Sequence, residues 1–245
     1  MSWWSLADAR FLLERALGLA RRGAISVRSR GWRASLERAG MTLRPLPRRL
    51  VPPVESAPGD YAPASVPASP APVASIVIPV HGQLRHTLAC LRALAAWPPR
   101  IPIEVIVVDD ASPDGTPDVL PGIAGLRYHR RAANGGFIAA CNDGAALAGG
   151  RYLVFLNNDT VPQPGWLDAL LATFEAEPGT GIAGAQLLYP DGRLQEAGGV
   201  VFADGSAWNY GRFGSPADPR FGYLRDVDYA SAAAIAIPRE LFTEV

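Results

Sequence analysis

The chain has 245 residues, of which 49% are hydrophobic and 19% are charged. That length can bury one substantial core and carry an appendage, but it excludes two full domains. The net charge is zero, and no uninterrupted run of eighteen apolar residues exists, which excludes a membrane-spanning helix. The only cysteines, Cys90 and Cys141, exclude a disulfide framework and a cysteine-based metal site, so we expect a reducing, cytoplasmic compartment.

Residues 1–44 are predicted to form a basic helical arm. Leu6, Leu13 and Leu17 fall on one stripe at helical spacing, and charged side chains interrupt the apolar stretch that a signal peptide needs. Residues 1–50 contain 11 arginines and three acidic residues, a net charge of +8, which leaves −8 on the rest of the chain. Two interpretations remain open: the arm packs on folded protein, or it makes a peripheral contact with an anionic membrane surface.

Residues 45–73 are rich in proline, alanine and serine. Proline cannot donate to a sheet and disfavours helix interiors, so this composition predicts an extended, disordered linker.

The pattern changes at residue 74 to alternating strands and helices. Apolar runs predict strands over 75–80, 103–110, 126–129 and 151–159. Helical spacing predicts helices over 83–96 and 135–148 and a third helix opened by Pro164. This alternation predicts an α/β domain over residues 74–245, with a mostly parallel, Rossmann-like sheet and flanking helices.

The last part of the chain predicts a hairpin and a final strand. The turn of the hairpin is placed at Asp191-Gly192. The final strand is predicted over 227–237, and Pro238 opens the helix that follows it.

Polar side chains follow three of the predicted strands at the point where each strand ends. His81 follows the first strand, Asp109 and Asp110 end the second, and the segment 157–160 follows the fourth. Ligands of open α/β sheets bind beyond the carboxyl ends of the strands, so these groups predict a binding site. Turn formation and helix capping would explain any one of the groups by itself.

Four segments carry a resemblance to a known family. SIVIPVHG, VIVVDDASPDGT, NGGFIAACNDG and YLVFLNNDTVPQPGWL resemble, in order and spacing, the family 2 glycosyltransferases of the GT-A fold, including O-antigen and rhamnosyltransferase-like members. The resemblance covers roughly residues 74–245. It implies transfer of a sugar, with inversion, from a nucleotide-diphosphate donor to a saccharide or lipid-linked saccharide acceptor in cell-surface polysaccharide or glycoconjugate synthesis. It implies a cytoplasmic enzyme, or one peripheral to the inner face of the membrane, and no nucleic acid partner is expected.

The resemblance also assigns residues. The implied donor-binding residues are Pro79, Val80, His81, Asp109, Asp110, Asn134, Gly135, Gly136 and Asn158. Among them, Asp109 or Asp110 would recognise the base and ribose. On the acceptor side it implies Trp208, Tyr210 and Asp228. Either of the two aromatic rings could instead fill the edge of a core.

A divalent cation, Mg²⁺ or Mn²⁺, is the implied cofactor. Asp159 and Asn157 are its expected ligands, since residues 157–159 occupy the Asp-x-Asp position of the family, with Asn157 in place of the first aspartate. A cation that bridges the diphosphate offsets the charge of the leaving group. One carboxylate with phosphates and waters is a usual environment for such a cation.

The catalytic base is not assigned by the sequence. An inverting transfer needs a carboxylate that accepts the acceptor proton, and in the family it follows the helix expected from Arg239, whereas this sequence ends at Val245. Asp226 and Asp228 are the nearest carboxylates, and we expect them in the donor-pocket wall or capping a strand. Our hypothesis is a partial protein with donor binding retained and catalysis impaired.

Three other functions compete with sugar transfer. A non-catalytic nucleotide-sugar-binding or scaffolding module is the alternative that the sequence leaves open. The segment 81–86 is not the glycine-rich basic loop of a sugar-nucleotide pyrophosphorylase, nor the G-x-G-x-x-G of a dinucleotide-binding oxidoreductase.

Overall fold

The computed structural model describes residues 27–28, 31–33, 36 and 61–245, and the chain divides into two compact units, residues 1–48 and 49–245. In the first unit, residues 27–28, 32–33 and 36 are helical, and Gly31 between them has a φ of 81°. The leucine stripe at 6–17 lies outside the described residues, so the amphipathic arm stays a prediction. None of the helices in the described segments is long and apolar enough to cross a membrane.

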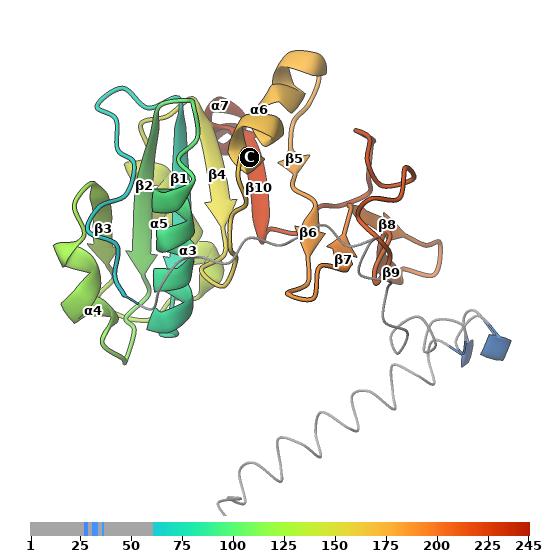
Figure 1. The fold of residues 1–245 in the computed structure, drawn as a ribbon, viewed down its shortest axis with the longest axis horizontal. Helices are drawn as coiled ribbons and strands as arrows, with labels where there is room; N and C mark the ends of the chain where they lie inside the picture. Colours follow the sequence, from blue (N-terminus) through green and yellow to red (C-terminus); the bar gives the residue numbers. More distant parts are fainter. Residues whose placement is uncertain (1–26, 29–30, 34–35, 37–60) are drawn as a thin grey trace, which may run out of the picture. The chain divides into compact units, whose positions relative to one another are not determined.

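The second unit is built on a six-stranded sheet with the order β3-β2-β1-β4-β10-β5 (Figure 1). Its parallel strands are β1 (Ala74–Val80), β2 (Ile103–Asp109), β3 (Leu126–Arg130) and β4 (Tyr152–Leu156). Strand β10 (Ala234–Pro238) runs antiparallel between β4 and the short β5 (Ala183–Gly184). Val80 pairs with Asp109, so β1 and β2 end level with each other.

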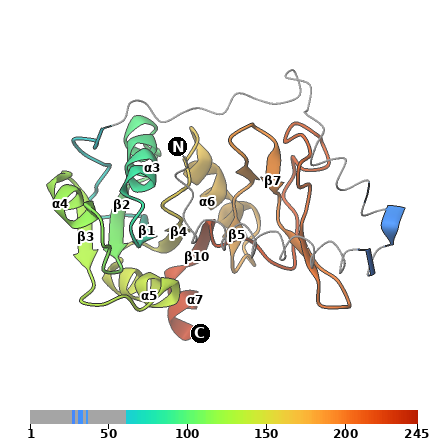
Figure 2. The ribbon, with the colours of Figure 1, turned by 90° about the horizontal axis from the view of Figure 1, so that it is seen from below.

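Helices cover both faces of the sheet (Figure 2). One face packs against α3 (Leu84–Ala96) and α6 (Trp166–Ala176), and the other against α5 (Phe137–Leu147) and α7 (Arg239–Glu244). Every residue of β1 and β2 is therefore buried. This explains why both strands are mostly apolar rather than alternating, with Ser75, Glu104 and Asp109 as their buried polar residues. Two turns between β2 and β3, α4 (Thr116–Val119) and a 3-10 turn (Leu120–Gly122), were not predicted.

Three predicted boundaries differ from the structure in ways that matter for the site or the sheet, and others differ by one or two residues. Strand β4 ends at Leu156, so the segment 157–160 forms the turn that follows it. Helix α6 begins at Trp166 after Gly165, whose φ is 74°, so Pro164 precedes the helix rather than opening it. The final strand is shorter than 227–237: residues before Ala234 lie outside β10, while helix α7 does follow Pro238 as predicted.

The predicted hairpin is present. Strands β6 (Leu187–Leu188) and β7 (Leu194–Glu196) pair antiparallel, and the Gly192 amide donates to the Tyr189 carbonyl oxygen at 2.8 Å across the turn. A second hairpin follows, of β8 (Gly199–Val201) and β9 (Ala207–Asn209).

The expectation of a disordered linker is wrong for residues 61–73. The Val66 amide donates to the Ala124 carbonyl oxygen at 2.9 Å, and the buried Val66 side chain joins the core on the α3 face. The Arg92 guanidinium donates to the Tyr61 carbonyl oxygen at 2.7 Å. Hydrogen bonds to the domain thus hold a proline-rich segment whose own composition supplies few partners. Residues 45–60 lie outside the described residues.

Candidate active site

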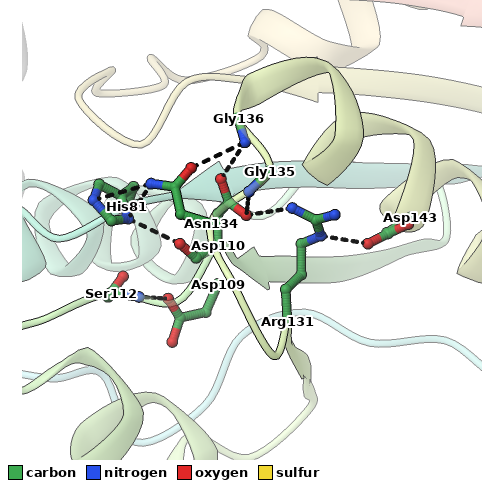
Figure 3. Close-up of polar contacts among 9 residues, drawn as sticks. All are labelled: His81, Asp109, Asp110, Ser112, Arg131, Asn134, Gly135, Gly136 and Asp143. Carbon is green, nitrogen blue, oxygen red and sulfur yellow. Dashed lines mark hydrogen bonds and ion pairs between the residues drawn. The ribbon is translucent and has the colours of Figure 1, made fainter.

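The ends of β1 and β2 meet the loop that precedes α5 (Figure 3). The His81 ring donates from Nδ1 to the Asp110 carbonyl oxygen at 2.8 Å, and the Asn134 amide nitrogen lies 3.3 Å from Nε2. A carbonyl oxygen only accepts, so Nδ1 donates in this bond, and the Asn134 amide nitrogen lies at nearly the same distance from Nδ1, 3.2 Å, as from Nε2. His81 and Asn134 thus present polar edges at the rim of the site. Pro79 and Val80 are buried in β1, where the Val80 carbonyl oxygen accepts the Asp110 amide at 2.7 Å.

The carboxylate oxygens of Asp110 accept hydrogen bonds from protein groups. Its Oδ1 accepts the Gly135 amide at 2.9 Å and an Arg131 guanidinium hydrogen, and its Oδ2 accepts the Gly136 amide at 2.7 Å. Burial opposes ionisation of this carboxyl, but the two amides and the guanidinium outweigh it and lower the pKa of Asp110. An ionised carboxylate therefore holds the Asn134–Gly136 loop.

Asp109 is completely buried, and its carboxylate also accepts hydrogen bonds from protein groups. It accepts the Ser112 amide at 2.7 Å, the Arg130 guanidinium at 2.6 Å and the Tyr128 hydroxyl. Burial opposes ionisation, yet the bonds from Ser112 and Tyr128 and the charge of Arg130 lower the pKa of Asp109. Burial and the adjacent Asp109 raise the pKa of Tyr128 to about 12.

The turn after β4 places the two predicted metal ligands. The Thr160 hydroxyl donates to the Asn157 carbonyl oxygen at 2.7 Å, which closes the turn. Asn158 points its amide toward α3, where it donates to the Thr87 hydroxyl at 3.0 Å. Asp159 is exposed, and within the part of the chain that the structure describes its carboxylate makes no hydrogen bond or ion pair. Asp159 is thus the carboxylate of this turn that is open to a ligand.

The donor set at this turn fits a hard cation bound partly by substrate. Among the described residues, no three histidine, cysteine, aspartate or glutamate side chains gather in a metal-binding group. Asp159 and the amide oxygen of Asn157 could supply at most a few oxygen ligands, and phosphates and waters would supply the rest.

The three predicted acceptor-side residues lie in the hairpin region. Tyr210 packs edge-on against Phe221, with ring centroids 5.2 Å apart, and Arg225 lies 4.3 Å from the Tyr210 centroid. The Arg212 guanidinium lies 5.6 Å from the centroid of the Trp208 ring. Asp228 caps strand β8 by accepting the Val201 amide at 2.8 Å.

Two hollows adjoin this region. Tyr210 and Asp228, with Arg225 and Asp226, line a hollow of about 230 Å³. A larger cavity of about 920 Å³ lies between the end of α6, strand β5 and the segment 223–230. Trp208 lines neither hollow.

Some residues at these sites, such as Arg131, Asp143 and Glu196, were not found from the sequence. Arg131 and Asp143 extend the Asp110 network, and the only available signal was the pair of arginines that follows the predicted strand 126–129. Glu196 on β7 is buried and accepts the Ser231 amide at 2.8 Å. Burial raises the pKa of Glu196, and the Ser231 bond opposes the rise only in part.

The sequence matches known proteins over most of the second unit. The family described as Glycosyl transferase family 2 matches residues 75–229. The uncharacterized protein y4gI of Sinorhizobium fredii is 31% identical and covers 71% of this chain. Glycosyltransferase AglE of Haloferax volcanii is 30% identical over 49% of the chain, and O-antigen biosynthesis protein RfbC of Myxococcus xanthus is 36% identical over 41%.

These relatives are longer than this chain. The matched segment spans 20% of y4gI, 42% of AglE and 8% of RfbC. Among solved structures, the mannosyltransferase PcManGT of Pyrobaculum calidifontis, in complex with GDP-Man and Mn2+, is 19% identical. It overlaps with a TM-score of 0.48, covering 75% of this chain and 50% of that one.

Proposed function

Because this chain belongs to glycosyl transferase family 2, we propose that it binds a nucleotide-diphosphate sugar at the carboxyl ends of β1, β2 and β4 and serves transfer of the sugar to an acceptor hydroxyl. The membership confirms the family and the α/β GT-A fold expected from the sequence. The activity, substrates and partners of the whole protein are part of this proposal.

One observation carries the proposal. Three neighbouring parallel strands, β2, β1 and β4, deliver Asp110, His81 and Asp159 to the same edge of the sheet. Ligands of open α/β sheets bind at this edge. Asp159 is exposed there without a hydrogen bond or ion pair to the described residues, so its carboxylate is accessible to a cation.

The residues of the turn would hold Mg²⁺ or Mn²⁺. When bound, the cation would neutralise the charge that develops on the diphosphate leaving group. Asp159 would provide the charged ligand and Asn157 a neutral oxygen. His81 and Asn134 would offer hydrogen-bonding groups to the base or ribose.

The finer parts of the proposal have separate support. Inverting transfer into cell-surface polysaccharide or glycoconjugate is proposed from the resemblance and from the relative named for O-antigen biosynthesis. A peripheral position on the cytoplasmic face of the membrane is proposed from the net charge of +8 on residues 1–50.

Calorimetric titration tests donor binding. UDP, dTDP and GDP are titrated with and without Mn²⁺ into the wild-type chain, Asp159→Asn and the control Glu175→Gln. Glu175 is an exposed carboxylate on α6. We expect metal-dependent binding of at least one nucleotide, weakened about tenfold or more in Asp159→Asn and retained in the control. Equal binding in Asp159→Asn would contradict the metal site.

A non-catalytic nucleotide-sugar-binding or scaffolding module is the second candidate. The observation that favours it is that Asp109, Asp110 and Asp228 are all engaged in bonds that hold the fold. Nucleotide binding without sugar transfer to any acceptor would support a binding module. A folded wild-type chain that binds no nucleotide would support a scaffold.

A further inference from the structure

Arg131 lies at the centre of the network that joins β2, β3 and α5 (Figure 3). It follows directly after β3, and its backbone amide donates to the Asp109 carbonyl oxygen at 2.9 Å. Its Nη1 donates to Asp110, and its Nε donates to Asp143 of α5 at 2.7 Å. The guanidinium is therefore fixed in position and direction by groups from two other elements.

The Asn134–Gly136 loop is shaped around this guanidinium. A Cβ at Gly135 would lie within 3.0 Å of Nη1, Nη2 and Cζ of Arg131, so a larger residue there would push the guanidinium away from Asp110 and Asp143. A Cβ at Gly136 would meet open space, but Gly136 has a φ of 85°, so its backbone conformation alone requires glycine. Both glycines are explained without a donor that approaches the loop.

We propose that Arg131 and Asp110 are positioning residues, which hold the Asn134–Gly136 loop in the shape that receives the nucleotide, and that the Asp110 carboxylate does not read the base. This inference rests on the proposed function. Asp110 already accepts three hydrogens and is 3% exposed, so a base edge has little access to it. Its effect reaches the ligand through Asn134, whose side-chain oxygen accepts the Gly136 amide at 3.1 Å and whose amide nitrogen contacts His81.

The two carboxylates around Arg131 differ in their surroundings. The Asp110 side chain is 5% exposed and the Asp143 side chain is 41% exposed. Solvent screens an exposed pair strongly, whereas loss of the guanidinium leaves Asp110 as a buried anion with two amides. Removing Arg131 should therefore loosen the loop far more than removing the charge of Asp143.

The test compares Arg131→Met, Arg131→Lys, Asp143→Asn and Asp110→Asn with wild type. Arg127→Met is the matched control, because Arg127 is an arginine of β3 itself and pairs at 2.5 Å with Glu104 near the opposite ends of the strands. Affinities for UDP, dTDP and GDP with Mn²⁺, the melting temperature, and the hydrogen exchange of the Gly135 and Gly136 amides are measured for each.

We expect Arg131→Met to lower the affinity for every nucleotide that wild type binds by a similar factor, about tenfold. We also expect faster hydrogen exchange of the Gly135 and Gly136 amides. Arg131→Lys restores part of the affinity, because it keeps the charge but not the two-pronged geometry. Asp143→Asn lowers the affinity and accelerates the exchange of the loop amides less than Arg131→Met does. Arg127→Met lowers the melting temperature without changing affinity or exchange in the loop.

Two results would overturn the inference. If Asp110→Asn lowers the affinity for nucleotides of one base and leaves the affinity for another base unchanged, Asp110 reads the base. Unchanged loop exchange in Arg131→Met would remove the positioning role. If wild type binds no nucleotide, the proposed function fails, and the exchange measurement still decides whether Arg131 and Asp110 hold the loop.

Discussion

The backbone amide of Asn157 donates to the carbonyl oxygen of Ala233 at 2.9 Å, which ties the turn that carries Asp159 to the residue before β10. Two residues earlier, the Ser231 amide donates to the buried carboxylate of Glu196 at 2.8 Å. A carboxylate on the β6–β7 hairpin is thus connected through the segment 231–233 to the proposed metal turn. The hairpin region, although outside the main sheet, supports the site.

The Glu196 carboxylate is expected to reduce stability as it ionises. Its pKa is raised in the folded state by burial, so the fold favours the protonated form, and stability falls as pH rises from its ordinary pKa through the raised one. Glu196→Gln keeps an acceptor for Ser231 and cannot ionise. We expect the stability of the variant relative to wild type to increase from about pH 4 to about pH 7, measured by urea unfolding.

Two results would contradict the prediction for Glu196. A stability of Glu196→Gln relative to wild type that stays constant with pH, or that falls as pH rises from about 4 to about 7, would contradict the raised pKa. Glu196→Ala is the companion variant, because it leaves the Ser231 amide without its acceptor. It should destabilise the fold by about 1–3 kcal/mol at about pH 4, and by less at about pH 7, where wild type has itself lost the stability of the protonated carboxyl.

The Asp110 network predicts the opposite dependence on pH. Because the folded-state pKa of Asp110 is lowered, its contribution is present above its ordinary pKa and is lost as pH falls toward the lowered one. Asp110→Asn should therefore be destabilised at about pH 7 and approach wild type below about pH 4. Thermal unfolding across this range measures the difference, with Asp118→Asn, an exposed carboxylate on α4, as the control. A gap of constant size would show that ionisation of Asp110 contributes nothing.

The parallel strands could be predicted because their burial determines their composition. Strands β1 and β2 are covered on both faces, and their central residues, 76–80 and 105–108, form continuous apolar runs. The sequence located strand β10 but not its first residue, because the start of this strand depends on pairing with β4 and β5, which are distant in sequence. The segment 61–73 was misread for a related reason: its backbone bonds with the carbonyl oxygens of Ala124 and Ile103 join it to residues that are distant in sequence.

The site could be predicted in outline but not in its connections. Strand ends indicated that Asp110, His81 and Asp159 share one edge of the sheet. That Asp110 holds Gly135 and Gly136, and that Arg131 lies between Asp110 and Asp143, depends on how α5 packs on the sheet. Such contacts follow from tertiary packing and have no signature in spacing along the chain.

Glu104 is expected to stabilise the edge of the sheet opposite the site. It is buried on β2 and accepts the Ser75 hydroxyl at 2.6 Å, the Gly149 amide at 2.7 Å and the Arg127 guanidinium at 2.5 Å. Glu104→Ala would leave these donors without an acceptor and should cost about 2–4 kcal/mol of unfolding free energy. Chemical denaturation measures the loss. Nucleotide affinity of the folded variant should stay at the wild-type value, and a weakened affinity would show that the two edges are coupled.

The segment 61–73 is expected to contribute to stability in proportion to the burial of its side chains. Val66 is 6% exposed and packs in the core, whereas Val73, in the same segment, is 37% exposed. Val66→Ala should therefore lower the unfolding free energy by about 1–3 kcal/mol, because it leaves a cavity in the core on the α3 face. Val73→Ala removes the same atoms at the surface and should change it by less than about 0.5 kcal/mol. Denaturant unfolding of the two variants compares the same valine-to-alanine change at a buried and at an exposed position. Equal, negligible effects would mean that the segment behaves as a disordered linker after all, and that the hydrogen bonds made by Val66 and Tyr61 do not persist in solution.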